Sequence, residues 1–175
     1  MASNFYHIPI GRLVFSTNPD DVLGIYGLGS CVAVVIYDPK AVIGGILHAL
    51  LPTKAKTESL VSNLPTKFVD QGIHKLLTEI CTAGAEESRL QIYLCGGAKV
   101  VATANYNEVF NIGQRNIETA RKVLQAAGLG IRAEAVGGTK GRTIKFYMAN
   151  GRLTVKTLGE AEETLNPRPP RRRTG

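Results

Sequence analysis

The chain has 175 residues, of which 44% are hydrophobic and 20% are charged, a composition typical of one globular domain with an ordinary core. Its apolar runs stop short of the roughly 18 residues that cross a bilayer, and its first residues lack the basic start and apolar core of a secretory signal. Four arginines in the last eight residues, RPPRRRTG, carry much of the net charge of +7, so the charge does not indicate a nucleic-acid-binding surface elsewhere.

The first half of the chain is rich in strand signals. Short apolar and β-branched runs predict strands at about 13–15, 22–28, 31–37 and 42–50, separated by turn residues such as Asp38-Pro39-Lys40. The polar segment 53–64 is expected to be a loop close to the functional site. Phe68, Ile73 and Leu76, with further apolar residues at the same spacing, then predict a helix that ends at Gly84.

The second half alternates between strands and one more helix. Strands are expected at 90–95, 131–136, 143–148 and 153–158, the last two joined by the turn signal Asn150-Gly151. Asn111, with Gln114 three residues later, predicts the start of a helix through a capping box, and Gly128 predicts its end. This order favours an α+β domain, with mixed β-sheets packed against two main helices.

The domain is expected to cover residues 1–158. The Pro- and Arg-rich segment 159–175 ends in residues that offer no large apolar side chain to bury, so it is expected to be a disordered tail. The three cysteines, Cys31, Cys81 and Cys95, are odd in number and lack zinc-ligand spacing. They indicate free thiols in a reducing cytoplasm rather than a disulfide framework.

One cysteine and one histidine stand in an unusual setting. Cys31 begins a predicted strand and His48 lies near the end of the next, so an antiparallel hairpin centred near residues 39–40 would place them opposite each other to within about a residue. Cysteine chemistry needs the thiolate, and a neighbouring imidazole can provide it. The alternative is an inert buried thiol and a histidine that satisfies a backbone partner.

Glycines stand close to both residues. Gly27 and Gly29 are expected to leave the face beside Cys31 bare for a substrate, and Gly44-Gly45 to open similar space ahead of His48. A tight bend at these glycines could also aim backbone N–H groups at a reacting carbonyl oxygen.

Five motifs in order, GLGSCVAVVIYDP, GGILHALLP, CGGAKV, NIGQRNIE and VGGTKGRTIKF, resemble those of the CheD family of chemoreceptor glutamine deamidases, over residues 10 to 158. The resemblance implies hydrolysis of receptor glutamines to glutamate with release of ammonia. It implies Cys31 as nucleophile, His48 as general base and acid, and oxyanion donors near Gly29–Cys31 or Gly96-Gly97, with no metal or organic cofactor. The implied fold is similar to the catalytic domain of cytotoxic necrotizing toxins.

One position departs from the family pattern. Members usually carry a threonine six residues before the cysteine, thought to orient the histidine, and here that residue is Ile25. Isoleucine has no side-chain hydrogen bond to offer. Either another group, such as a backbone carbonyl, orients His48, or the protein is a weak or inactive CheD-like adaptor that binds receptors or CheC.

The resemblance also implies partners. These are the cytoplasmic helices of chemoreceptors and, in many species, the phosphatase CheC, with no nucleic acid and no direct membrane insertion. Tyr106, in the segment TANYNEVFNIG, is a candidate contact residue, whereas Phe110 is better explained as packing at the start of the second helix.

Overall fold

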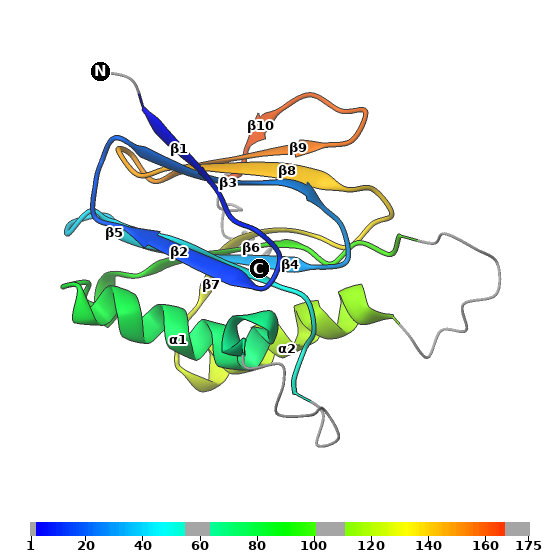
Figure 1. The fold of residues 1–175 in the computed structure, drawn as a ribbon, viewed down its shortest axis with the longest axis horizontal. Helices are drawn as coiled ribbons and strands as arrows, with labels where there is room; N and C mark the ends of the chain where they lie inside the picture. Colours follow the sequence, from blue (N-terminus) through cyan, green and yellow to red (C-terminus); the bar gives the residue numbers. More distant parts are fainter. Residues whose placement is uncertain (1–2, 55–63, 101–110, 167–175) are drawn as a thin grey trace, which may run out of the picture.

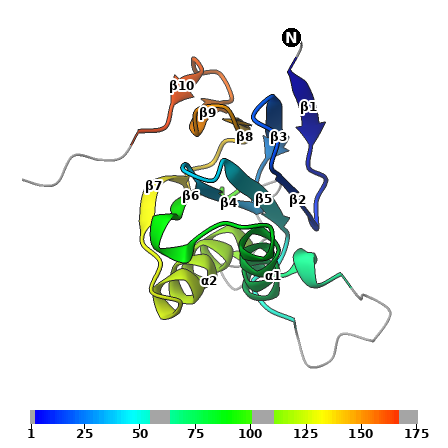
Figure 2. The same ribbon diagram turned by 90° about the vertical axis from the view of Figure 1, so that its left-hand side faces the viewer.

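The computed structural model describes residues 3–54, 64–100 and 111–166. Two five-stranded sheets lie face to face, and two helices cover the outer face of one of them, giving three layers (Figures 1 and 2). The helices are α1 (Val69–Thr82) and α2 (Ile112–Ala126), and two short 3-10 turns are η1 (Pro65–Lys67) and η2 (Glu87–Arg89). The expected α+β class is confirmed.

Both sheets are mixed. The first is ordered β1-β3-β8-β9-β10, with β1 (Asn4–His7), β3 (Asp21–Leu28), β8 (Arg142–Tyr147), β9 (Arg152–Thr157) and β10 (Glu163–Thr164). The second is ordered β2-β5-β4-β6-β7, with β2 (Arg12–Ser16), β5 (Ile43–Ala49), β4 (Val32–Asp38), β6 (Gln91–Gly96) and β7 (Ile131–Val136). The β1–β3 and β6–β7 pairs are parallel, and the remaining pairs are antiparallel.

The second sheet is buried on both faces, and β4 shows why its sequence is apolar throughout. Alternate side chains point to opposite faces of a strand, so Val35 packs toward the first sheet and Val34 toward the helices. Tyr37 ties the two sheets together: its ring meets Phe146 edge-on at 5.1 Å, and its hydroxyl donates a 2.8 Å hydrogen bond to the carbonyl of Met148. The layer between the sheets is therefore a packed, mostly apolar interior.

The two helices begin and end where the sequence indicates. In α2 the side chain of Asn111 accepts a hydrogen bond from the backbone N–H of Gln114 at 3.2 Å, so the cap is confirmed. The capping box is only half formed, because the Gln114 side chain donates to Glu118 instead. Gly84 and Gly128 follow the two helices with positive φ.

Two short edge strands were not predicted. All four residues of β1 are exposed, so the strand leaves no alternating apolar pattern in the sequence. The strand β10 lies in the segment expected to be a tail, and it extends the first sheet past the boundary predicted at 158. The chain beyond residue 166, most of the loop predicted at 53–64, and both Tyr106 and Phe110 lie outside the described residues.

Neither described helix combines the length and apolar character needed to cross a membrane.

Candidate active site

The three residues Gly29, Ser30 and Cys31, here called the Cys31 loop, carry the chain from the first sheet into the second. Before the loop, β3 is irregular between Ile25 and Leu28, and Gly27 has a φ of 65°. The regular alternation of side chains along a strand therefore does not hold between Ile25 and Cys31. Both side chains nevertheless lie in the apolar layer between the sheets, and Ile25 is fully buried there.

Cys31 and His48 lie on the same face of the second sheet but are not directly opposite. In the β4–β5 ladder His48 pairs with Ala33, two residues after Cys31. The sequence predicted opposition to within about a residue, and the ladder gives an offset of two residues. Because side chains alternate with a period of two, the shift preserves the shared face, and Cys31 and His48 are diagonal neighbours across the strands.

The turn between the strands explains the shift. The last ladder pair joins Asp38 to Ile43, so four residues form the loop instead of the tighter turn assumed from Asp-Pro-Lys. The Asp38 carboxylate accepts hydrogen bonds from the N–H groups of Lys40 and Ala41 at 3.0 and 3.1 Å, which stabilises this longer loop. Val42 completes it with a φ of 55°, a conformation unusual for a β-branched residue.

The imidazole of His48 is buried and held by the main chain. Its Nδ1 lies 2.9 Å from the carbonyl oxygen of Ile8, in the connection between β1 and β2. A carbonyl only accepts, so the proton sits on Nδ1 and the Nε2 lone pair remains available as a base. Burial lowers the pKa of His48, with the Ile8 carbonyl opposing the effect and His7 adding to it. The backbone carbonyl that the sequence analysis offered as a substitute for the family threonine is present.

The thiol of Cys31 is also largely enclosed, with 6% of the residue exposed. Burial raises its pKa, while its own backbone N–H lowers the pKa through a hydrogen bond to the sulfur. These directions favour uncharged groups at neutral pH, a protonated thiol and a neutral imidazole on one face of the sheet. The arrangement can support nucleophilic attack in which the imidazole takes the thiol proton as the bond forms.

The carbonyl groups of the Cys31 loop are anchored by the chain that follows β6. The N–H of Ala98 donates to the carbonyl of Gly29 at 2.9 Å, and the N–H of Gly97 donates to the carbonyl of Cys31 at 2.8 Å. Because the Gly97 N–H is already engaged, it is not a free oxyanion donor, and that expectation is corrected. Gly96 and Gly97 both have positive φ, and a Cβ on Gly96 would overlap the Cys31 carbonyl.

The two glycine pairs differ in the space around them. A Cβ on Gly27 would meet no atom within 4 Å of the described structure, and one on Gly29 would meet Val100 at 3.4 Å. At Gly44 and Gly45, in contrast, a Cβ would approach backbone oxygens of the neighbouring strands at 2.9 and 2.6 Å. That pair allows close strand packing and does not open a path to His48.

Sequence reasoning missed a buried amide beside the site. The Nδ2 of Asn116, in α2, donates to the carbonyl oxygens of Ser30 and Leu50, each at 3.0 Å. The residue is fully buried within the apolar stripe of the helix. The available signal was a polar residue next to Ile117, at a position where the 3.6-residue period calls for an apolar one.

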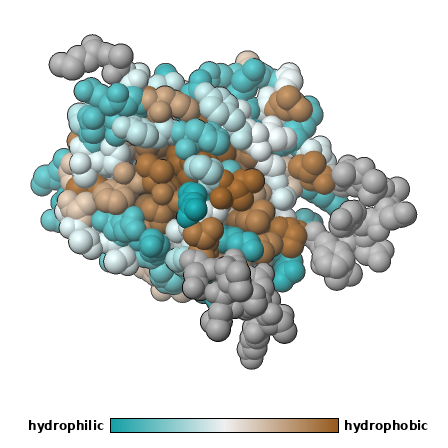
Figure 3. Space-filling model, viewed as in Figure 1, coloured by the Kyte–Doolittle hydropathy of each residue, from teal (hydrophilic) through white to brown (hydrophobic). Residues whose placement is uncertain are grey.

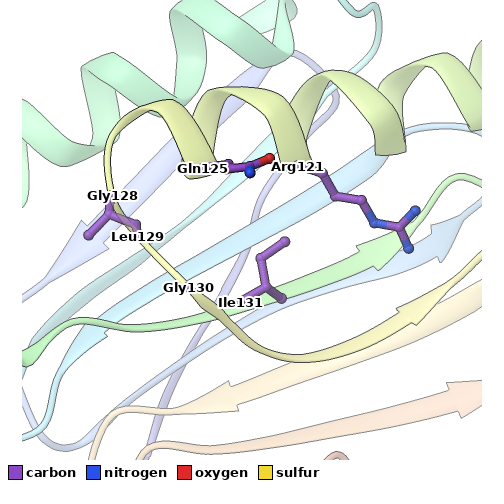
Figure 4. Close-up of a pocket in the computed structure, with 6 residues that line it drawn as sticks. All are labelled: Arg121, Gln125, Gly128, Leu129, Gly130 and Ile131. Atoms are coloured by element: carbon purple, nitrogen blue, oxygen red, sulfur yellow. The ribbon is translucent and has the colours of Figure 1, made fainter.

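The other cysteines lack this setting. Cys95 is completely buried, and burial raises its pKa to about 12. Cys81 is exposed on α1, and burial and the neighbouring Glu87 raise its pKa. A hollow of about 420 Å³ lies between the end of α2 and the start of β7, lined by Arg121, Gln125, Gly128, Leu129, Gly130 and Ile131 (Figure 4). It contains none of the predicted site residues.

The sequence profile described as "CheD chemotactic sensory transduction" matches residues 50–157 of this chain. This chain belongs to the CheD family. The matched residues begin after Cys31 and His48, so the profile itself does not bear on those two positions.

Relatives of the CheD family cover most of the chain. A protein from Solibacter usitatus named "Probable chemoreceptor glutamine deamidase CheD" is 41% identical over 84% of this chain and 85% of its own length. A protein of the same name from Caldanaerobacter subterraneus subsp. tengcongensis is 42% identical over 82% and 87%. The "Chemoreceptor glutamine deamidase CheD" of Halalkalibacterium halodurans is 35% identical over 84% and 90%.

A solved structure of the Bacillus licheniformis hypothetical protein YfiH aligns with 79% of this chain and 60% of its own, at 13% identity and a TM-score of 0.42. That similarity is too low to establish a common fold.

Proposed function

We propose that this protein is a chemoreceptor glutamine deamidase in which Cys31 is the nucleophile and His48 the general base and acid. Membership of the CheD family and the names of its relatives support the activity. One observation carries the residue roles: His48 shares a sheet face with Cys31, and its Nδ1 is held by the Ile8 carbonyl, which leaves Nε2 free to take a proton.

The chemistry proceeds in two halves. The sulfur of Cys31 forms a bond to the side-chain amide carbon of glutamine as His48 Nε2 accepts the thiol proton. His48 then returns that proton to the amide nitrogen, the C–N bond breaks, and ammonia leaves behind a γ-glutamyl thioester. In the second half His48 takes a proton from water, hydroxide adds to the thioester carbon, and glutamate departs as the Cys31 thiol is restored.

Backbone N–H groups of the Cys31 loop provide the oxyanion site in this proposal. Among the described residues, the N–H groups of Gly29, Ser30 and Cys31 have no backbone carbonyl partner. N–H donors that no backbone carbonyl occupies, next to the nucleophile, are what a tetrahedral intermediate requires, since charge develops on its oxygen. Ser30 and Cys31 are the favoured donors, and Gly96-Gly97 form the support behind them.

A second candidate is an adaptor that binds receptors without chemistry. The adaptor is favoured by Ile25, which is apolar and fully buried in the layer that holds the site. The threonine that CheD proteins usually carry at this position is missing. The Ile8 carbonyl argues for the enzyme, since it performs the orienting role that the threonine would otherwise fill. In either case the proposed partners are receptor cytoplasmic helices, with CheC as a further proposed partner, and the proposed location is the cytoplasm.

Incubation with receptor cytoplasmic fragments tests the two candidates. Peptide mass spectrometry should detect glutamine-to-glutamate conversion by the wild-type protein and none by Cys31→Ala or His48→Ala. Cys81→Ser is the matched control, because it removes an exposed thiol remote from the proposed chemistry. Receptor binding without any conversion would contradict the enzyme and establish the adaptor.

Restoring the family residue provides a companion test. Since His48 is already oriented by Ile8, we expect Ile25→Thr to leave the conversion rate within about twofold of Ile25→Val, a variant of similar shape without the hydroxyl. A tenfold gain in Ile25→Thr would show that the natural site is compromised.

A further inference from the structure

We propose that Asn116 is a positioning residue for the deamidation reaction: it aims the backbone N–H of Cys31 at the oxyanion and ties the Cys31 loop to the strand that carries His48. The inference rests on the proposed function and extends it to a residue of α2, a helix that contributes no reacting group.

The location of Asn116 calls for an explanation. The residue is fully buried at a position where the helix otherwise presents apolar side chains, and its Oδ1 has no hydrogen-bond partner among the described residues. A buried acceptor without a partner destabilises the fold, so an apolar residue of similar volume would pack here more favourably. Asparagine differs from such an apolar residue in the two N–H donors on its Nδ2, and these make the two hydrogen bonds to Ser30 and Leu50.

Both donors are used, and few side chains could replace them. The oxygens of Ser30 and Leu50 are carbonyl acceptors, which cannot bond to each other and need a donor between them. A single neutral nitrogen with two hydrogens meets that need. The charged groups of lysine and arginine would require a buried counter-ion at the same place.

The bond to Ser30 fixes the direction of the catalytic N–H. The carbonyl of Ser30 and the N–H of Cys31 belong to one peptide group, and the chain contains no cis peptide bond among its described residues. In a trans peptide these two groups point in opposite directions, so holding the Ser30 oxygen toward α2 turns the Cys31 N–H away from it.

The bond to Leu50 fixes the other half of the site. The β4–β5 ladder ends with the pair Val32 and Ala49, one step before the strands would reach Cys31 and Leu50. Beyond that pair the Asn116 side chain joins the two segments in place of the ladder. It therefore sets the separation between the Cys31 loop and the end of the His48 strand.

The test compares deamidation, which passes through an oxyanion, with alkylation of Cys31, which does not. Asn116→Leu retains volume without donors, and Asn116→Asp retains shape but, when ionised, can only accept. By analogy with hydrogen bonds that orient metal ligands, whose loss costs about 10- to 100-fold, we expect both to lower kcat for deamidation about 10- to 100-fold, with KM within about twofold. Alkylation of Cys31 by iodoacetamide develops no oxyanion, so its rate should fall by a much smaller factor than kcat does.

A control on the same helix separates positioning from stability. Asn111→Ala removes the helix cap and so lowers the stability of the fold, but it leaves both Asn116 bonds intact, so its kcat should match the wild type. Full kcat in Asn116→Leu, or equal losses in deamidation and alkylation, would overturn the inference alone. If the wild type converts glutamine and Cys31→Ala does not, the proposed deamidase function stands whatever Asn116 does. If the wild type shows no conversion, both the proposed function and the role of Asn116 are overturned.

Discussion

At the scale of residues, the site depends on burial as much as on residue type. Burial raises the pKa of Cys31 and lowers that of His48, so the two groups rest as thiol and imidazole instead of as an ion pair. The sequence shows that a cysteine and a histidine stand at positions 31 and 48, but it does not show how deeply either side chain is buried. The Ile8 carbonyl that orients His48 is a main-chain group, and a main-chain group leaves no signature in residue identity.

The neutral pair predicts a particular pH dependence. The pKa of His48 lies below its ordinary 6.5 and that of Cys31 above its ordinary 9.0, so the reactive form is fully populated between those values. We expect kcat/KM on a glutamine peptide to be level from pH 7 to 9 and to decline only below 6.5, as His48 becomes protonated. Full activity at pH 5 followed by loss near pH 8.5 would instead indicate a thiolate–imidazolium pair.

At the scale of elements, the β4–β5 turn sets the register that brings Cys31 and His48 to one face. Asp38 shapes the turn, and its buried carboxylate is paired with Arg89 at 2.7 Å and accepts from the N–H of Glu86 at 2.8 Å. Arg89 holds the pKa of Asp38 well below its usual range. The sequence showed a turn here, but its length depends on these long-range partners, which explains the error of two positions.

Removing Arg89 should therefore be costly. We expect Arg89→Met to lower the free energy of unfolding by about 3 kcal/mol, because a buried carboxylate loses its counter-ion. The difference in free energy of unfolding between the wild type and Arg89→Met should narrow as the pH falls below 3.8. Over that range protonation of Asp38 also removes the stabilising ion pair from the wild type. Urea unfolding provides the measurement.

The control for Arg89 is the Arg121 pair with Glu134, which is more exposed. Arg121→Met should cost less than about 1 kcal/mol. Equal losses in the two variants would show that the Asp38 pair is no more important than a surface contact.

At the scale of the whole molecule, the chain builds a three-layer structure whose middle sheet is buried on both faces. The sequence predicted this class well, because the apolar run of β4 and the helical stripes are strong patterns. It missed β1 and β10, which are short edge strands with exposed residues. Apolar side chains also gather on the face of the molecule shown in Figure 3. Two exposed apolar residues lie at an edge of the second sheet: Ile10 precedes the edge strand β2, and Phe15 is part of it.

The unpredicted β10 has a measurable consequence. A chain ending at Leu158 loses the hydrogen bonds from Leu165 to Leu153 and from Thr154 to Glu162, together with the packing of Leu165 against the layer between the sheets. We expect its free energy of unfolding to fall by about 2 kcal/mol. A chain ending at Asn166 retains these contacts and should match the full-length protein. Equal stability of the two truncated chains would contradict a structural role for β10.

The central claim is that the Cys31 sulfur carries the substrate acyl group during turnover. Acid quenching of the reaction with a glutamine peptide, within the first turnover, followed by peptide mass spectrometry tests this most directly. We predict that the fragment containing Cys31 gains the mass of the substrate peptide minus ammonia, as a hydroxylamine-sensitive thioester, and that Cys31→Ala shows neither adduct nor conversion. Conversion by Cys31→Ala, or an adduct on another residue, would contradict the account.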